Sequence, residues 1–169
     1  LGKNNNYFLS DSFVYNHIGI QIVNGNGILL ENGDPNFLRM PGYSAFLAFI
    51  YKFAGINPEI AMWFQIILAS LFPVLIFLLA YVLFPKKILL AKVASFISAI
   101  HLGFVFLSGV LMTETLFNLF FIIFLILFLS SFSFWFEKKE IKLSYFKLIL
   151  IGFCLGIVSL IRPIGHYVL

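Results

Sequence analysis

Charged side chains are scarce in this chain of 169 residues. Asp, Glu, Lys and Arg make up 11% of it, against about 25% in soluble globular proteins. Hydrophobic residues make up 62%, and the mean hydropathy is +1.04. This composition excludes an ordinary soluble domain and predicts an all-α integral membrane protein.

Cysteine is almost absent, and several catalytic motifs are lacking. The one cysteine, Cys154, lies inside an apolar run, which excludes an internal disulfide and favours a small buried hydrophobe. The chain has no Walker loop, dinucleotide-binding glycine fingerprint or nucleophile elbow, which argues against a nucleotide-driven pump or a hydrolase domain. No histidine belongs to a pair with zinc-binding spacing, so we do not expect a zinc site.

A signal peptide is not visible at the start of the chain, and its last residues lie in an apolar segment without a termination signal. We therefore expect a fragment truncated at both ends, with at least one span before Leu1 and several after Leu169. Residues 1–57 are predicted to form an extracytoplasmic loop with short interfacial helices, and residues 58–169 a transmembrane bundle of about four spans.

Two short helices are predicted in the first part. Ser10 or Asp11 can cap a helix that ends before Gly25, in which apolar residues recur at helical spacing: Val14, Ile18 and Ile22. We expect this amphipathic helix to lie flat on the membrane surface. A second run, residues 43–53, follows a Pro-Gly pair and is too short to cross a bilayer, so it is interfacial or re-entrant.

The four predicted spans cover residues 58–84, 88–102, 114–135 and 145–161. Pro73 predicts a kink in the first of them, and Gln65 in the same span is typical of hydrogen bonding between helices. Residues 101–108 look less regular, because glycines interrupt them.

Lysines fix the expected orientation, and they account for the formal charge of +4 without nucleic-acid binding. They gather in two short loops, which are therefore cytoplasmic: Lys86, Lys87 and Lys92 in one, and Lys138, Lys139, Lys142 and Lys147 in the other. Alternating spans then place Asp11, Arg39, Glu114 and Arg162 together on the extracytoplasmic side.

Each of these four residues has a structural and a functional interpretation. Asp11 is an N-cap or an active carboxylate, and Glu114 complements a helix dipole or serves a functional site at the mouth of an apolar helix. Arg39 and Arg162 are interfacial anchors or a clamp for a phosphate group. The residues alone leave these alternatives open.

Four motifs follow one another in order: Ser10-Asp11-Ser12-x-x-Tyr15, Arg39-Met40-Pro41-Gly42-Tyr43-Ser44-x-Phe46-Leu47, Met112-Thr113-Glu114-Thr115-Leu116-Phe117 and Gly152-x-x-x-Gly156-x-x-x-Leu160-Ile161-Arg162-Pro163. Together they resemble the amino-terminal half of the GT-C membrane glycosyltransferases. The similarity is greatest to the superfamily of dolichyl-phosphate-mannose protein mannosyltransferases and aminoarabinose transferases. Two positions depart from the family pattern, because Thr115 and His101 stand where relatives often have proline.

The resemblance implies a GT-C-type helix bundle that moves a sugar from a polyprenyl-phosphate donor to a glycan, lipid or protein acceptor outside a bacterial plasma membrane. It implies that Asp11 is the general base of an inverting transfer and that Glu114 orients the acceptor or shares a divalent metal ion with Asp11. Arg39 and Arg162 would bind the donor phosphate. Three further residues would line the acceptor groove: Tyr15, Tyr43 and His166.

Two other functions compete with this one. A multi-span transporter or flippase subunit would use buried acids as an ion path near the bilayer midplane, and Glu114 at a helix end speaks against it. A non-catalytic membrane scaffold would leave Asp11 and Glu114 replaceable.

Overall fold

The computed structural model describes residues 10–35, 39–136 and 145–163, and the regular structure in them is helical apart from one isolated β-bridge between Leu29 and Pro35. The helices are α1 Ser10–Val23, α2 Pro41–Ala54, α3 Pro58–Ala69, α4 Phe72–Leu83, α5 Ile88–Ala99, α6 Leu102–Ser108, α7 Thr113–Phe136 and α8 Tyr145–Ile161. The predicted all-α class is confirmed.

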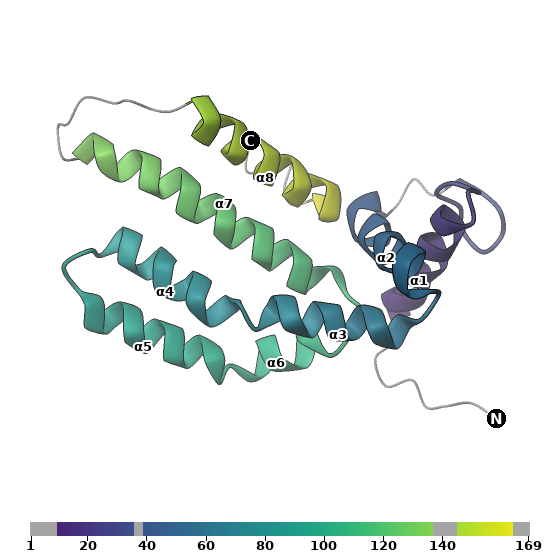
Figure 1. Cartoon of the computed structure of the whole chain (residues 1–169), viewed down its shortest axis with the longest axis horizontal. Coiled ribbons are helices and arrows are strands. Elements are labelled where there is room, and N and C mark those ends of the chain that lie inside the picture. The colour runs from purple at the N-terminus through teal and green to yellow at the C-terminus, as the bar shows by residue number, and fades with distance from the viewer. Residues whose placement is uncertain (1–9, 36–38, 137–144, 164–169) are drawn as a thin grey trace.

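The helices form an elongated bundle with a separate pair at one end (Figure 1). Helices α3 to α8 run along the long axis, with α4 packed on α5 and α7, and α7 packed on α8. Helices α1 and α2 pack on each other at the end where α7 begins and α8 finishes. The link between α4 and α5, which carries Lys86 and Lys87, lies at the opposite end.

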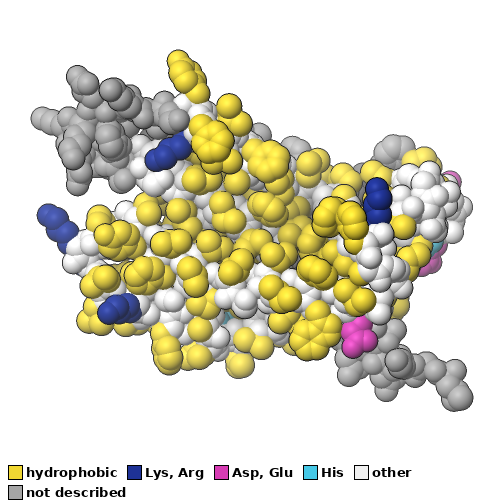
Figure 2. Space-filling model, viewed as in Figure 1, with side chains coloured by type: hydrophobic (Ala, Val, Ile, Leu, Met, Phe, Trp, Pro, Cys, Tyr) yellow, Lys and Arg dark blue, Asp and Glu magenta, His cyan; other side chains and the backbone are white. Residues whose placement is uncertain are grey.

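Within the part of the chain that the structure describes, two helical segments are long and apolar enough to cross a membrane: Pro58–Leu83, which comprises α3 and α4, and Thr113–Ser131 of α7. Helices α5 and α6 make a third if they are taken together as one bent span. Helix α8 occupies the predicted range, but its 17 residues extend about 25 Å, less than a hydrocarbon core of about 30 Å. Figure 2 shows a broad apolar surface with charged side chains only toward its two ends.

Helix α2 has the start and stop that the sequence predicts. Pro41 occupies its first turn, where the missing N–H costs no helical hydrogen bond, and Gly55 ends it with a φ of 78°. The structure extends the predicted run of residues 43–53 by two residues at its start and one at its end.

The buried face of α1 differs from the predicted one. Only Ile18 of the expected apolar stripe is buried, while Val14 and Ile22 are partly exposed. The face toward α2 instead contains Ser12, Tyr15, Ile18 and Gly19. A β-carbon on Gly19 would lie 3.1 Å from the Leu47 Cβ, so close approach of the helices, and not hydrophobicity alone, selects this face.

Two of the long segments are broken near one another. Helix α3 gives way to α4 at Ser70 and Leu71, just before Pro73, as the predicted kink requires because proline cannot donate to the carbonyl four residues earlier. Helices α5 and α6 meet at 49°, and the His101 ring nitrogen Nδ1 accepts a hydrogen bond from the Phe104 amide. The expectation of an irregular stretch at 101–108 is therefore wrong for Leu102–Ser108, which is helical.

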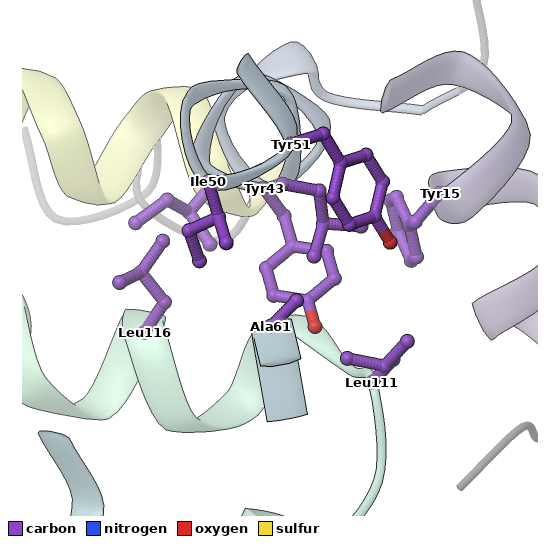
Figure 3. Packing of buried hydrophobic residues seen from close by; sticks show 9 residues of the cluster. Tyr15, Tyr43, Ile50, Tyr51, Ala61, Leu111 and Leu116 are labelled. Carbon is purple, nitrogen blue, oxygen red and sulfur yellow. The ribbon is translucent and has the colours of Figure 1, made fainter. Parts of the chain in front are cut away.

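The main hydrophobic core lies where α2 meets the bundle. It consists of Tyr15, Tyr43, Leu47, Ile50, Tyr51, Ala61, Leu111, Leu116 and Ile161. Figure 3 shows Tyr43 pointing from α2 toward Ala61 of α3. This core therefore joins α1, α2, α3, α7 and α8 directly beside the charged residues that the sequence singles out.

Candidate functional site

A polar cavity of about 140 Å³ lies at the junction of α1, α2, α7 and α8. Its lining consists of Asp11, Tyr15, Arg39, Met40, Met112, Thr113, Glu114, Ile161, Arg162 and Pro163. The structure thus brings together all four charged residues that the sequence places on one side. They come from four segments that are far apart in the chain, so the cavity exists only in the folded bundle.

Asp11 and Arg39 form a two-pronged ion pair on one wall of the cavity. Arg39 Nη2 lies 2.7 Å from Asp11 Oδ1, and Nη1 lies 3.2 Å from Oδ2. The guanidinium carbon also sits 5.9 Å from the centre of the Tyr15 ring. Both carboxylate oxygens therefore accept from one planar group, an arrangement that arginine makes and lysine cannot.

Glu114 and Arg162 form the second ion pair, with a different geometry. Arg162 Nη2 lies 3.2 Å from Glu114 Oε1, and its guanidinium carbon lies 5.6 Å from the centre of the Phe117 ring. The Thr113 hydroxyl donates to Glu114 Oε2 over 3.4 Å. Glu114 is the less exposed partner, because 19% of its side chain is accessible compared with 33% for Arg162.

Tyr15 lies between the two charge pairs. Burial raises the pKa of its phenol; the nearby Arg39 charge opposes that rise, while Asp11 and Glu114 add to it. The hydroxyl therefore stays protonated near neutral pH and presents a neutral hydrogen-bonding group inside the cavity.

Tyr43 does not line the cavity, contrary to its expected role in an acceptor groove. Its side chain is fully buried, and its hydroxyl donates to Gln65 Oε1 over 2.8 Å. Burial raises the pKa of Tyr43 well above its ordinary value, which keeps this donor protonated. Its role in the described structure is to join α2 to α3. His166, the other expected groove residue, lies outside the described residues.

Gln65 is the buried residue that holds the connection before α7. Its Nε2 lies 2.6 Å from the Val110 carbonyl oxygen and 3.2 Å from those of Leu107 and Ser108. The two N–H groups of the amide are thus shared among three acceptors. This connection leads directly to Glu114, so Gln65 sets the backbone that carries the second acid. The sequence indicated helix bonding for Gln65 but not its connection to the site.

Gly42 sets the distance between α2 and the end of α8. A β-carbon there would lie 2.6 Å from the Leu160 carbonyl oxygen and 3.0 Å from the Ile161 backbone nitrogen. Any side chain would force the two backbones apart. Because Arg39 precedes α2 and Arg162 follows α8, this contact brings the two arginines to the same cavity.

An apolar groove of about 380 Å³ adjoins the polar cavity. It is lined by Gly42, Ala45 and Phe46 of α2, Leu68 of α3, Leu116, Leu119 and Phe120 of α7, and Ile157, Leu160 and Ile161 of α8. Ile161 lines both spaces. The two spaces therefore both border the end of α8, immediately before Arg162.

A divalent metal ion is a poor fit to Asp11 and Glu114 in this geometry. Each carboxylate already binds a guanidinium group, and a metal ion would have to share them with two positive charges. Among residues 10–35, 39–136 and 145–163, no group of three or more His, Cys, Asp or Glu side chains has the geometry of a metal site.

Comparison with protein-family models, with curated proteins and with solved structures finds no match to this chain. The cavity, the groove and the sequence motifs are therefore the features from which a function can be inferred.

Proposed function

We propose that this chain belongs to a membrane glycosyltransferase of the GT-C type, which transfers a sugar from a polyprenyl-phosphate carrier to an acceptor outside a bacterial plasma membrane. The observation that carries the proposal is that the charged cavity and the apolar groove share Ile161 in their linings. An amphiphile with an anionic head and a hydrocarbon tail matches both spaces at once. A water-soluble substrate would leave the groove unused.

The orientation of the protein follows from its charge distribution. The lysine-bearing link between α4 and α5 lies at the cytoplasmic end under the positive-inside rule, and the cavity lies at the other end. The acceptor hydroxyl therefore comes from the extracytoplasmic side, and the carrier reaches the groove from within the bilayer.

The transfer is a direct displacement at the anomeric carbon of the donor sugar. The acceptor oxygen forms the new bond to that carbon while the bond to the phosphate oxygen breaks, and the polyprenyl phosphate leaves with the electron pair. Asp11 takes the proton of the acceptor hydroxyl, which is a poor nucleophile until that proton is removed. Attack opposite the leaving phosphate inverts the anomeric centre. Glu114 orients the acceptor.

Substitution of Asp11 tests this function. Asp11→Asn removes the proton acceptor with almost no change in volume, and loss of a general base typically costs about 10²- to 10⁴-fold in rate. We expect that loss in the transfer of radiolabelled sugar from a polyprenyl-phosphate donor by the full protein in lipid nanodiscs. Asp34→Asn is the matched control, because Asp34 is exposed in the outer loop and hydrogen bonds to Asn32.

Three outcomes would contradict the proposal. An intact rate in Asp11→Asn would remove Asp11 as the base. Wild-type protein that forms no glycosyl product, but takes up an ion in a manner sensitive to Glu114→Gln, would identify a transporter. Wild-type protein that forms no glycosyl product, and that keeps its role when both Asp11 and Glu114 are substituted, would identify a scaffold.

A further inference from the structure

We infer that the two arginines of the cavity have different roles: Arg162 receives the anionic head group, and Arg39 is a positioning residue that holds Asp11. The sequence suggests the same phosphate-binding role for both. This inference rests on the proposed function, and different experimental outcomes would contradict each of them.

Arg39 is already engaged by Asp11 through both terminal nitrogens. The distances of 2.7 and 3.2 Å use both carboxylate oxygens, and the guanidinium packs against the Tyr15 ring. A head group that took these two nitrogens would leave the Asp11 carboxylate without its partner. Because the side chains are 38% and 37% exposed, such a pair contributes about 1 kcal/mol or less to stability. Its clearer consequence is that the carboxylate has one fixed orientation.

Arg162 uses fewer of its guanidinium nitrogens in its ion pair than Arg39 does. Among the described residues, its ion pair is one contact of 3.2 Å from Nη2 to Glu114. The fork of a guanidinium carries five N–H donors, so a phosphate can bind at Nη1 and Nε while the contact with Glu114 persists. The Phe117 ring supports the guanidinium from one face.

The position of Arg162 also favours the head group. It directly follows Ile161, which lines both the polar cavity and the apolar groove. Neither arginine lines the groove, but along the chain the nearest groove residue is one position from Arg162, at Ile161, and three positions from Arg39, at Gly42. A phosphate joined to a hydrocarbon chain in the groove therefore meets Arg162 first, and Asp11 on the Arg39 wall faces the same cavity from the acceptor side.

Two charge-balanced double variants test the division of roles. Asp11→Asn with Arg39→Gln, and Glu114→Gln with Arg162→Gln, each remove one ion pair and leave the net charge of the cavity unchanged. The probe is farnesyl phosphate, bound to the full protein in lipid nanodiscs. We expect the first variant to keep the wild-type affinity within about 3-fold and the second to lose about 10-fold or more, as loss of a hydrogen bond between charged groups predicts.

A chemical probe tests the positioning role directly. Dicyclohexylcarbodiimide adds to a carboxyl oxygen, and Arg39 engages both oxygens of Asp11, so Asp11 should react slowly. We expect faster modification of Asp11 in Arg39→Gln, measured by mass spectrometry, with partial protection restored by Arg39→Lys. Asp34 serves as the internal control, because it is exposed and hydrogen bonds to Asn32, so its modification should not change.

The outcomes separate the inference from the proposed function. Equal loss of farnesyl phosphate affinity in both double variants would overturn the division of roles and leave the function intact. Unchanged modification of Asp11 in Arg39→Gln would overturn the positioning role. Wild-type protein that does not bind farnesyl phosphate would overturn the proposed function and the role of Arg162 together.

Discussion

The two ends of the bundle are held together in different ways. At the cavity end, buried polar groups join one element to another: Tyr43 to Gln65, Gln65 to the carbonyls before α7, Ser44 to the Tyr15 carbonyl and Tyr51 to Asn16. In the α4–α5 arm, by contrast, the buried side chains beyond Phe72 at its start are small (Ala80, Ala91 and Ser98), and large apolar ones are exposed: Leu89 is 72% and Phe96 66% exposed. Directional bonds fix the cavity, whereas the arm presents an apolar surface suited to lipid.

Removal of the Gln65 amide should give the largest loss of stability. Gln65→Leu removes the partner of the Tyr43 hydroxyl and the short hydrogen bond to the Val110 carbonyl oxygen, at about 1–3 kcal/mol for each buried group left unsatisfied. We expect the free energy of unfolding in detergent to fall by about 3 kcal/mol or more.

Two further variants sharpen this prediction. Adding Tyr43→Phe to Gln65→Leu removes the orphaned hydroxyl and should restore part of the loss. Gln21→Leu changes a glutamine of α1 whose side-chain amide bonds to His17 and Asn26 at partly buried and exposed positions, and it should cost much less. If Gln21→Leu is as damaging as Gln65→Leu, burial of the Gln65 amide does not explain the cost of losing it.

Adding a side chain at Gly42 should cause the next largest loss of stability. Gly42→Ala places a methyl group 2.6 Å from the Leu160 carbonyl oxygen, and overpacking of this kind costs about 1–3 kcal/mol. Thermal unfolding and the transfer assay should both show a loss, because α2 and α8 carry the two arginines.

Gly152→Ala provides the matched control on α8. A β-carbon at Gly152 meets no atom within 4 Å, and alanine favours a helix over glycine by about 1 kcal/mol. The two substitutions should therefore shift the melting temperature in opposite directions. A stabilising Gly42→Ala would show that α2 and α8 are not in close contact.

The smallest effect should come from the outer surface of the arm. Phe96→Ala removes a large side chain that is 66% exposed, and substitutions at such positions change stability by about 0.5 kcal/mol or less. Thermal unfolding in detergent checks this prediction. A loss comparable to that of Gln65→Leu would mean that Phe96 packs against something other than lipid.

The sequence predicts the features of this fold that depend on local chemistry. The range of α8 and the break before Pro73 agree with the structure, and the bounds of α2 agree to within two residues, because proline, glycine and apolar runs act on their own segment. The lysine rule and alternating spans also predict that four distant charged residues gather at one end, where the structure places them.

Other features depend on contacts between segments, which no local pattern contains. The pairing of Asp11 with Arg39 depends on the packing of α1 on α2, and that of Glu114 with Arg162 on the packing of α7 on α8. The motif around Tyr43 predicts a groove residue. In the structure its hydroxyl instead donates to Gln65, 22 positions later in the chain, and this hydrogen bond is buried. The buried face of α1 likewise depends on the surface of α2.

The breaks beside Pro73 and His101 divide these apolar helices into two tiers: α3 with α6, and α4 with α5. Ser95 of α5 donates a hydrogen bond to the Pro73 carbonyl oxygen of α4. The Phe72 and Phe104 rings pack edge to face across the boundary between the tiers. Helix α7 contacts both tiers: α3 and α6 in one, and α4 in the other. Because α7 spans the boundary between the tiers and begins with Thr113 and Glu114, the packing of both tiers sets the position of the second acid.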